Sequence, residues 1–314
     1  MTELISGLHN LKANHKGCVL AIGNFDGLHQ GHLAIIHTLQ QQAKRLNLPS
    51  CVMLFEPHPQ EFFLGQKAPA RLMRFREKIK IFKSLSVDRV LCLRFNKHLA
   101  EMEAETFVKE ILVCRLGVHL VIVGDDFQFG ITRQGDANRL KKLGQQYQFA
   151  VYVNPTVLFA GQRIGSSLVR DVVKQGNFAL VLRLLTRPFT LSGRVMRGAQ
   201  SGRLLGFPTA NIALHRFVSP LTGVFIVRVH GYEKKPLDAV VNCGRRPTIN
   251  GSKDLLEVHL LDFCQNIYGY CLEIEFLEKI RDEKKFDSLD ALKEQIAKDI
   301  IFAKEYLNLK TKAS

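Results

Sequence analysis

The stretch of sequence that decides the fold is Gly23-Asn24-Phe25-Asp26-Gly27-Leu28-His29-Gln30-Gly31-His32. An apolar run, residues 18–22, precedes it, and an amphipathic run, residues 33–46, follows it. This order predicts a strand that turns directly into a helix. The glycines allow tight or positive-φ backbone conformations and a close approach to a ligand. The stretch therefore predicts a strand, a turn and a helix that together receive a ligand.

The start of the expected helix is a candidate phosphate site. Backbone N–H groups and the positive end of the helix dipole attract anions there. His29 and His32 are three residues apart, so their side chains share one face of the helix and point at the same anion. In the alternative interpretation the glycines only form a connection and the histidines only cap or decorate the helix. Because strand, glycines, histidine pair and helix occur in the required order, a triphosphate site is favoured.

Length and composition are typical of a soluble protein with two domains. The chain has 314 residues, of which 46% are hydrophobic and 23% charged. Its net charge of +15 is spread over both halves, without a block of five or six consecutive basic residues or a basic stripe interleaved with aromatic residues. The sequence therefore does not indicate a nucleic-acid partner. Polyanionic small substrates account for part of the positive charge.

The cysteines and the apolar runs indicate the compartment. The chain has seven cysteines, none with the C-x-x-C spacing of a zinc or redox site, and most of them lie in apolar runs. They are therefore expected to be buried free thiols. No run reaches the roughly 18 to 20 apolar residues of a bilayer span, and the N-terminal segment has no apolar signal-peptide core. We expect a cytoplasmic protein with no membrane partner, as a monomer or weak oligomer.

The first half of the chain alternates strand-like and helix-like segments. Such alternation predicts an α/β domain with a parallel sheet and helices on both faces. Ligands of such sheets bind at the carboxyl ends of the strands. The expected strands are 18–22, 51–55, 90–93, 119–123 and 149–153, and the expected helices are 33–46, 74–85, 105–114, 137–146, 168–174 and 178–185.

Three further motifs follow expected strands or open a helix. They are Phe55-Glu56-Pro57-His58-Pro59, Gly124-Asp125-Asp126-Phe127-Gln128-Phe129-Gly130 and Ser166-Ser167-Leu168-Val169-Arg170. In the first, two prolines fix a rigid turn that carries an aromatic ring and an imidazole to the sheet edge. The second offers two carboxylates and two rings, and the third offers hydroxyls at a helix start with an arginine one turn further on. The alternatives are a turn, a solvated acidic loop and a plain N-cap.

The pattern changes near residues 185–188, which predicts two domains, 1–186 and 187–314. Short strand-like runs separated by turn residues follow this boundary, and they predict a small antiparallel β-barrel. A single apolar face predicts a C-terminal helix over 289–306. The expected strands of the barrel are 190–196, 223–229, 238–242, 255–260 and 270–276.

The glycine-rich stretch 198–211 carries the chemistry of the second half. Its glycines, among them Gly202 and Gly206, form a loop whose amides can wrap phosphates. Thr209 and Asn211 are two residues apart, so both point to one side of an extended segment, where their oxygens can coordinate or orient Mg²⁺. The Walker A pattern is absent. The alternative is a glycine-rich hairpin followed by a strand with ordinary polar residues.

The N-terminal motifs resemble a known family. The stretch 23–32 resembles the signature of the nucleotidylyltransferase superfamily, in the form found in FAD synthetases. With the three further motifs, it is similar to the adenylyltransferase half of bacterial bifunctional riboflavin kinase/FMN adenylyltransferases. The resemblance implies a Rossmann-like, nucleotidylyltransferase-type fold with catalytic roles for His29 and His32. It also implies ATP contacts for Gly23, Asn24, Phe25, Asp26, Gly27, Ser166, Ser167 and Arg170, and flavin contacts for Phe55, Pro57, His58, Asp125, Asp126 and Phe127.

The second half resembles the riboflavin kinase of the same family. Gly206-Phe207-Pro208-Thr209-Ala210-Asn211 is similar to the motif whose threonine and asparagine serve the magnesium–ATP complex. Residues 256–262 resemble the segment that carries the catalytic base, which implies this role for Glu257. Residues 279–289 resemble the flavin-covering segment, which implies a flavin contact for Arg281. Without the resemblance, Glu257 is interpreted as a strand surface residue and 279–289 as a charged loop.

Two segments depart from the family pattern. Gly165 and Ser167 stand where the family usually has serine and threonine, and Arg245 stands where it commonly has threonine. A hydroxyl and Arg170 remain, so activity is expected to be retained. Arg245 adds a positive charge next to the expected kinase site.

The resemblance implies an enzyme with two ATP-dependent steps. The C-terminal barrel phosphorylates riboflavin to FMN, and the N-terminal domain converts FMN and a second ATP to FAD and pyrophosphate, with Mg²⁺ as cofactor. Two other classes stay open. One is a monofunctional transferase whose other half is a regulatory or flavin-storing module, and the other is a nucleic-acid-binding protein that uses the +15 charge.

Overall fold

The chain forms two compact units in the computed structural model. The structure describes all residues except 1, 198–205, 215, 217, 249–250 and 313–314, and it does not describe the side chains of 245–248, 251–254 and 311–312. Unit 1 comprises Met1–Pro69 and Met73–Ser166, and unit 2 comprises Ala70–Leu72 and Ser167–Ser314. The contacts thus change units at Ser166, before the expected boundary at 186/187, which stays a prediction.

Unit 1 is built on a six-stranded parallel sheet with the order β1-β4-β3-β2-β5-β8, which confirms the expected fold class. Strand β1 is not among the expected strands, because this four-residue edge strand exposes three of its residues and shows no apolar run. The order reverses between β2 and β5, and ligands of such sheets bind at this switch point. The strands are β1 (Glu3–Ser6), β2 (Cys18–Ile22), β3 (Ser50–Glu56), β4 (Arg89–Arg94), β5 (Val118–Gly124) and β8 (Ala150–Asn154).

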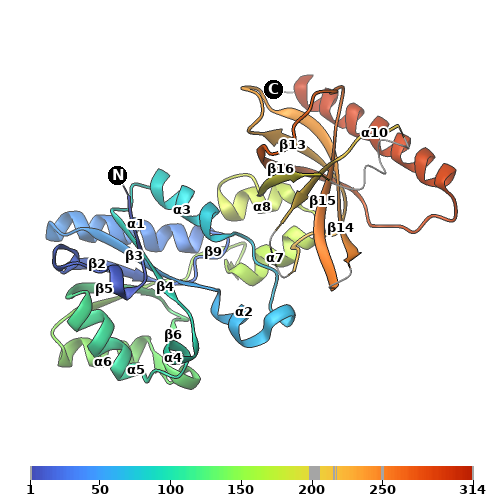
Figure 1. Cartoon of the computed structure of the whole chain (residues 1–314). Helices are drawn as coiled ribbons and strands as arrows, with labels where there is room; N and C mark the ends of the chain where they lie inside the picture. Colours follow the sequence, from blue (N-terminus) through green and yellow to red (C-terminus); the bar gives the residue numbers. More distant parts are fainter. Residues whose placement is uncertain (1, 198–205, 215, 217, 249–250, 313–314) are drawn as a thin grey trace. The chain divides into compact units, whose positions relative to one another are not determined.

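Helices cover both faces of this sheet, as expected (Figure 1). Helix α1 (Gln30–Leu46) contacts β2, β3 and β5 on one face. On the other face, η4 (Phe107–Arg115) and α6 (Ala137–Gln146) pack into one apolar core with alternate residues of the strands. The expected helix at 105–114 is a short α-turn, α5 (Ala104–Thr106), followed by the π-helical η4.

Shorter elements complete unit 1. Helix α3 (Phe75–Ser84) matches the expected helix 74–85. The others are α2 (Pro59–Leu64), α4 (Lys97–Ala100), the 3₁₀ turns η1 (Leu8–Asn10), η2 (Ala13–His15), η3 (Gly65–Lys67) and η5 (Ile131–Arg133), and two hairpins, β6 (Gln128–Phe129) with β7 (Gly135–Asp136) and β9 (Leu158–Phe159) with β10 (Gln162–Arg163).

Unit 2 is a closed antiparallel barrel with the strand order β11-β12-β15-β14-β13-β16, which confirms the expected barrel. Strand β12 is not among the expected strands, because its four residues are too few to show a pattern. The elements are α7 (Ser166–Gln175), α8 (Phe178–Leu185), β11 (Thr190–Met196), β12 (Ala210–Ala213), β13 (Gly223–His230), β14 (Leu237–Thr248), β15 (Gly251–Leu260), β16 (Cys271–Arg281) and α10 (Leu289–Lys312).

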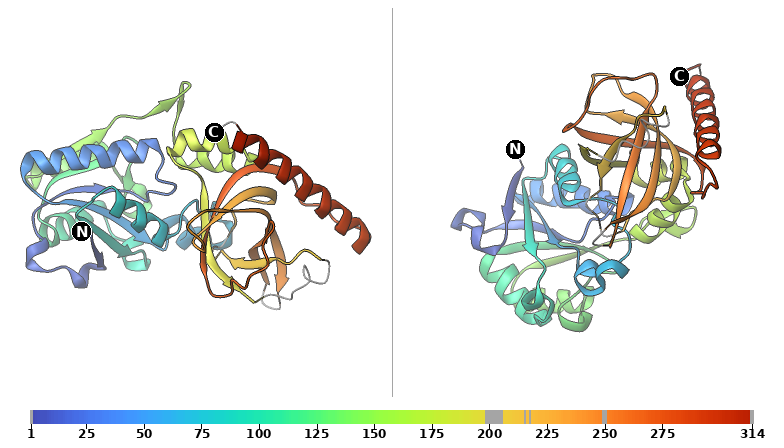
Figure 2. Two further views of the ribbon diagram at one scale, coloured as in Figure 1. Left: turned by 90° about the horizontal axis from the view of Figure 1, so that it is seen from above. Right: turned by 45° about the vertical axis from the view of Figure 1, so that its right-hand side comes forward.

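Two helices pack against the barrel. On α8, the Phe178 ring lies 5.6 to 6.4 Å from the rings of Phe189, Phe225 and Phe276. Helix α10 runs along the outside of the barrel, where Ala303 and other residues pack on β13 and β14 (Figure 2). Apolar side chains therefore fix both helices to the barrel.

The described residues are consistent with the expected thiol chemistry. All seven cysteines are free, and Cys18, Cys51, Cys92 and Cys243 are buried, while the other three are exposed. Burial, with the negative charge of Glu56 as a second cause, raises the pKa of Cys92 to about 11. Within the described part of the chain, no helix combines the length and apolarity needed to cross a membrane.

A buried ion pair attaches α10 to the barrel. Arg281, at the end of β16, donates from Nε and Nη2 to the Asp299 carboxylate over 2.8 to 3.0 Å, and these side chains are 14% and 4% exposed. Asp299→Ala leaves a guanidinium buried without its carboxylate, so we expect a loss of about 3 to 5 kcal/mol in the free energy of unfolding. Urea unfolding measures this loss. Glu294→Ala, an exposed change on the same helix, is the control, and equal stability of the two variants would refute the prediction.

Two candidate active sites

A tightly wound segment, the glycine-rich turn (residues 23–29), joins β2 to α1 in unit 1. Its backbone enters the left-handed region at Phe25, Gly27 and Leu28, with φ of 49°, 84° and 42°. Of Gly23, Gly27 and Gly31, for which tight or positive-φ conformations were expected, only Gly27 has a positive φ. Phe25 and Leu28 are fully buried, and bulky residues take this conformation only where packing enforces it. The turn is therefore held rigidly before any ligand binds.

The two histidines lie together at the start of α1, as predicted. His29 is the N-cap residue of α1 and is 5% exposed. Its ring stacks on that of His32, with centroids 3.7 Å apart and planes at 22°. Phe25 contacts the other side of the pair, with its ring centroid 5.2 Å from that of His32. The imidazoles thus lie beside the first amides of α1, which suits an anionic ligand.

Glycine gives extra room at two positions where rings approach the backbone. A Cβ added to Gly31 would lie 3.2 Å from Nδ1 of His29, and a Cβ added to Gly23 would lie 3.2 Å from the Phe25 ring. Both distances are shorter than ordinary contacts. These glycines therefore make room for the rings of the site rather than for a positive φ.

Asp26 accepts two hydrogen bonds that fix the glycine-rich turn to other segments of the chain. Its carboxylate is 2% exposed and accepts from the Met73 amide over 3.0 Å, and its carbonyl accepts from the Ser166 hydroxyl over 2.9 Å. Asp26 and Ser166 thus contact each other, as two residues of one site should. Their roles toward ATP stay predictions.

The loop after β3 brings aromatic and imidazole groups to the same edge of the sheet. Pro57 follows a cis peptide bond, and His58 caps α2 by accepting from the Gln60 amide over 3.2 Å. The Phe55 ring packs edge-on against Phe95, with centroids 6.0 Å apart. Because β3 is next to β2 in the sheet, this loop lies beside the glycine-rich turn.

The loop after β5 forms ion pairs with the β9–β10 hairpin, which was not expected from the sequence. Arg163, on β10, donates to Asp125 and Asp126 over 2.9 and 2.8 Å. Phe127 stacks on Phe129, with ring centroids 5.3 Å apart. The flavin contacts predicted for Asp125, Asp126 and Phe127 stay predictions, and the carboxylates have a partner in Arg163.

The residues that open α7 are divided between the two units, because Ser166 is the last residue of unit 1. Ser167 and Arg170 belong to unit 2, where Arg170 Nε donates to the Ala70 carbonyl over 2.7 Å. A Cβ added to Gly165 would meet no described atom within 4 Å, so the serine usual in the family would fit there. The departure at Gly165 is thus not forced by packing.

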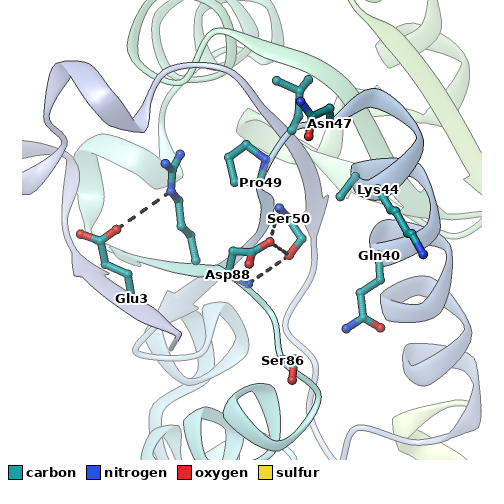
Figure 3. A pocket seen from close by; sticks show the side chains of 11 residues that line it. Glu3, Gln40, Lys44, Asn47, Pro49, Ser50, Ser86 and Asp88 are labelled. Atoms are coloured by element: carbon teal, nitrogen blue, oxygen red, sulfur yellow. Dashed lines mark hydrogen bonds and ion pairs between the residues drawn. The ribbon is translucent and has the colours of Figure 1, made fainter.

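A cavity of about 580 Å³ lies at the opposite, amino-terminal edge of the sheet (Figure 3). The Asp88 carboxylate accepts from the amide and hydroxyl of Ser50 over 2.9 and 2.6 Å. Glu3 pairs with His15 over 3.1 Å and with Arg89 over 4.0 Å. Because Ser50, Asp88, Glu3 and Arg89 line the cavity and already have partners, we assign no ligand to it.

In unit 2, strand pairing places a polar row on the barrel. Glu257 on β15 lies directly opposite Asn211 on β12 and Asn242 on β14, and paired residues point to the same face. The Asn242 amide donates to the Glu257 carboxylate over 3.4 Å. Asn211 is 8% exposed. The structure therefore brings together two predicted residues, Asn211 and Glu257, and adds Asn242.

A histidine holds the glycine-rich motif against this row. His259, two residues after Glu257, donates from Nδ1 to the Pro208 carbonyl over 2.9 Å, and its ring lies edge-on to Phe207. Thr209 follows immediately and leads into β12. Gly206 has a φ of 86°, and Gly202 lies outside the described residues, as does the side chain of Arg245.

The segment after β16 adds a second carboxylate beside the row. Burial raises the pKa of Glu283, the negative charge of Glu257 raises it further, and Arg281 opposes both. A Cβ added to Gly244 would collide with a Glu283 carboxylate oxygen. Arg281 itself binds Asp299 and stacks over Phe286, 5.7 Å from its ring centroid. Its flavin contact stays a prediction.

Two family models match the chain in succession. The FAD synthetase model matches residues 11–168, and the riboflavin kinase model matches residues 185–307. A crystal structure from Streptococcus pneumoniae, described as a macrolide-efflux protein, matches with a TM-score of 0.80 and 27% identity over 96% of this chain and 98% of that one.

Curated relatives match over almost the whole length. The bifunctional riboflavin kinase/FMN adenylyltransferase of Escherichia coli K12 is 48% identical, and that of Haemophilus influenzae is 46% identical, each over 98% of this chain and 98 to 99% of the relative. The protein of the same name from Pseudomonas fluorescens is 46% identical over 96% of this chain and 97% of its own length. The chain belongs to the family of bifunctional riboflavin kinase/FMN adenylyltransferases.

Proposed function

We propose that the chain converts riboflavin to FAD in two ATP-dependent steps at two separate sites. The observation that carries this is the presence, in one chain, of the stacked histidines at the start of α1 and of the polar row around Glu257. Riboflavin kinase activity belongs to the C-terminal part of the chain and FMN adenylyltransferase activity to the N-terminal part.

In the adenylyl transfer step, the phosphate of FMN attacks the α-phosphate of ATP, and pyrophosphate leaves. His29, His32 and the first amides of α1 stabilise the negative charge that builds up on the phosphates. Ser166, Ser167 and Arg170 contribute further contacts to ATP. The protein forms no covalent intermediate in this step, because positioning of the substrates and electrostatic stabilisation of the transition state account for most of the reduction in the activation barrier.

In the kinase step, Glu257 accepts the proton of the riboflavin 5′-hydroxyl as that oxygen attacks the γ-phosphate of ATP. Asn242, within hydrogen-bond reach, orients the Glu257 carboxylate. The hydroxyl of Thr209 and the amide oxygen of Asn211 would hold Mg²⁺. This donor set fits, because Mg²⁺ prefers oxygen ligands and completes its shell with water and substrate phosphates.

Three further features belong to the proposal. The two catalytic domains are residues 1–186 and 187–314, since the riboflavin kinase model begins at residue 185. The protein works in the cytoplasm, where ATP and flavins are available. It acts as a monomer or weak oligomer.

Chromatographic separation of flavins tests the function. The purified full-length protein is incubated with riboflavin, excess ATP and Mg²⁺, and we expect riboflavin to become FMN and then FAD. FMN that accumulates without FAD would mean that the adenylyltransferase is inactive, and Gly165 would be the first position to restore to serine. Riboflavin that stays unchanged while added FMN becomes FAD would place the defect in the kinase, near Arg245.

A further inference from the structure

A buried lysine lies directly behind the glycine-rich turn. Lys78, on α3, is 1% exposed, and its Nζ donates to the Asn24 carbonyl over 2.7 Å. Lysine is almost never fully buried unless its charge is paired or hydrogen-bonded, because removing the ammonium from water is costly. Here the ammonium is paired with a backbone carbonyl that belongs to the glycine-rich turn, so the buried charge is part of the support of that turn.

Two side chains of helix α3 contact Asn24 and Phe25, two consecutive residues of the glycine-rich turn. Lys78 and Phe82 are four residues apart, so they share one face of the helix. Lys78 binds Asn24, while the Phe82 ring lies edge-on to Phe25, with centroids 5.6 Å apart. α3 thus fixes both the backbone before the left-handed residues and the first bulky side chain among them.

These contacts continue to the histidines. The Phe25 ring touches His32, and His32 stacks on His29, so the turn, Phe25 and the imidazoles form one contiguous chain of packed groups. The positive charge of Lys78 is also felt at Cys92 on β4. Burial and the negative charge of Glu56 raise the pKa of Cys92, and the charge of Lys78 lowers it. Lys78 therefore places a positive charge at the edge of the sheet where ligands of this fold class bind.

We propose that Lys78 is a positioning residue for adenylyl transfer, which fixes the Asn24 carbonyl and adds a buried positive charge behind the turn that receives the triphosphate of ATP. This inference rests on the proposed site at His29 and His32. Lys78 does not touch the reacting atoms in this role. It acts through the turn and through its charge, which a low-dielectric interior screens weakly.

The test compares four full-length proteins, the wild type, Lys78→Met, Lys78→Gln and Lys83→Met. Lys83 is exposed on the same helix and is the matched control. FAD formation from FMN gives kcat and KM for ATP, and calorimetry with pyrophosphate measures binding of the triphosphate-derived product without chemistry. FMN formation from riboflavin reports on unit 2 in each preparation, and thermal unfolding sets a temperature at which each variant is folded.

We expect Lys78→Met to lower kcat/KM for FAD formation by roughly 100-fold, the cost of misplacing reacting groups by about 1 Å. Pyrophosphate affinity should fall about tenfold, as for the loss of one unit charge near the ligand. FMN formation and the Lys83→Met variant should match the wild type. A folded Lys78→Met protein with kcat/KM and pyrophosphate affinity within threefold of the control would overturn the proposal, since it would leave Lys78 only a structural role.

Lys78→Gln decides the matter if Lys78→Met does not fold. Glutamine can still donate a hydrogen bond toward Asn24 but carries no charge. Weakened pyrophosphate binding by this variant supports the proposal, and wild-type binding overturns it. Failure of the proposed function is seen separately, because the wild type would then form no FAD, or His29→Ala would form it at the wild-type rate.

Discussion

His29→Ala is expected to reduce FAD formation from FMN by about 10²- to 10³-fold, the usual cost of removing one preorganised group that stabilises transition-state charge. The His29 ring is 5% exposed and stacks on His32 at the N-terminus of α1, so its loss removes one imidazole and leaves the other without its stacking partner. Conversion of riboflavin to FMN should be unchanged, because Glu257 and its partners belong to unit 2. Flavin chromatography measures both rates in one preparation.

Two controls separate chemistry from folding. His37→Ala removes an exposed histidine on the same helix, where it contacts only Gln41 among the contacts described, and should leave both rates unchanged. The His29 side chain makes no capping hydrogen bond, and His29→Asn introduces a favourable N-cap residue, so α1 keeps its start while the imidazole is lost. If folded His29→Ala protein lost both activities, the proposal of two separate sites would be wrong. Unaltered FAD formation would remove His29 from the mechanism.

The features predictable from the sequence are those made by neighbours along the chain. β2, the glycine-rich turn and α1 are consecutive, so one stretch of residues carries the strand pattern, the turn residues and the helix pattern. The His-x-x-His spacing then places both imidazoles on one face. The backbone within the turn was less predictable. Packing, rather than glycine alone, sets the positive φ of Phe25 and Leu28, and no local signal reports it.

Long-range partners were not predictable from one sequence. Asn242 and Glu257 meet because β14 and β15 pair in one particular register, and Arg163 meets Asp125 because a hairpin returns to the loop after β5. Lys78 looks like any lysine of a basic helix until the structure buries it. In each case the residue type was visible, but its partner lay elsewhere in the chain. The resemblance to a family identified Glu257 and the segment that begins at Asn242, although it gave Asn242 no role, and nothing comparable pointed to Arg163 or Lys78.

Glu257→Gln is expected to reduce FMN formation from riboflavin by about 10²- to 10⁴-fold, the usual contribution of a positioned general base. Glutamine has nearly the same shape and can still accept the hydrogen bond from Asn242, so the polar row keeps its packing while the proton acceptor is lost. FMN supplied directly should become FAD at the wild-type rate. The measurement is the initial rate of each flavin conversion at saturating ATP.

The matched control is Glu275→Gln on β16, a barrel carboxylate that already binds His230 over 2.7 Å and takes no part in the polar row. It should leave FMN formation unchanged. A Glu257→Gln protein that phosphorylates riboflavin within threefold of this control would exclude Glu257 as the base. The next candidate would then be Glu283, whose pKa is raised by burial and by the charge of Glu257. In the Glu257→Gln background burial still raises the pKa of Glu283, so Glu283→Gln in that background would show whether Glu283 takes over the role.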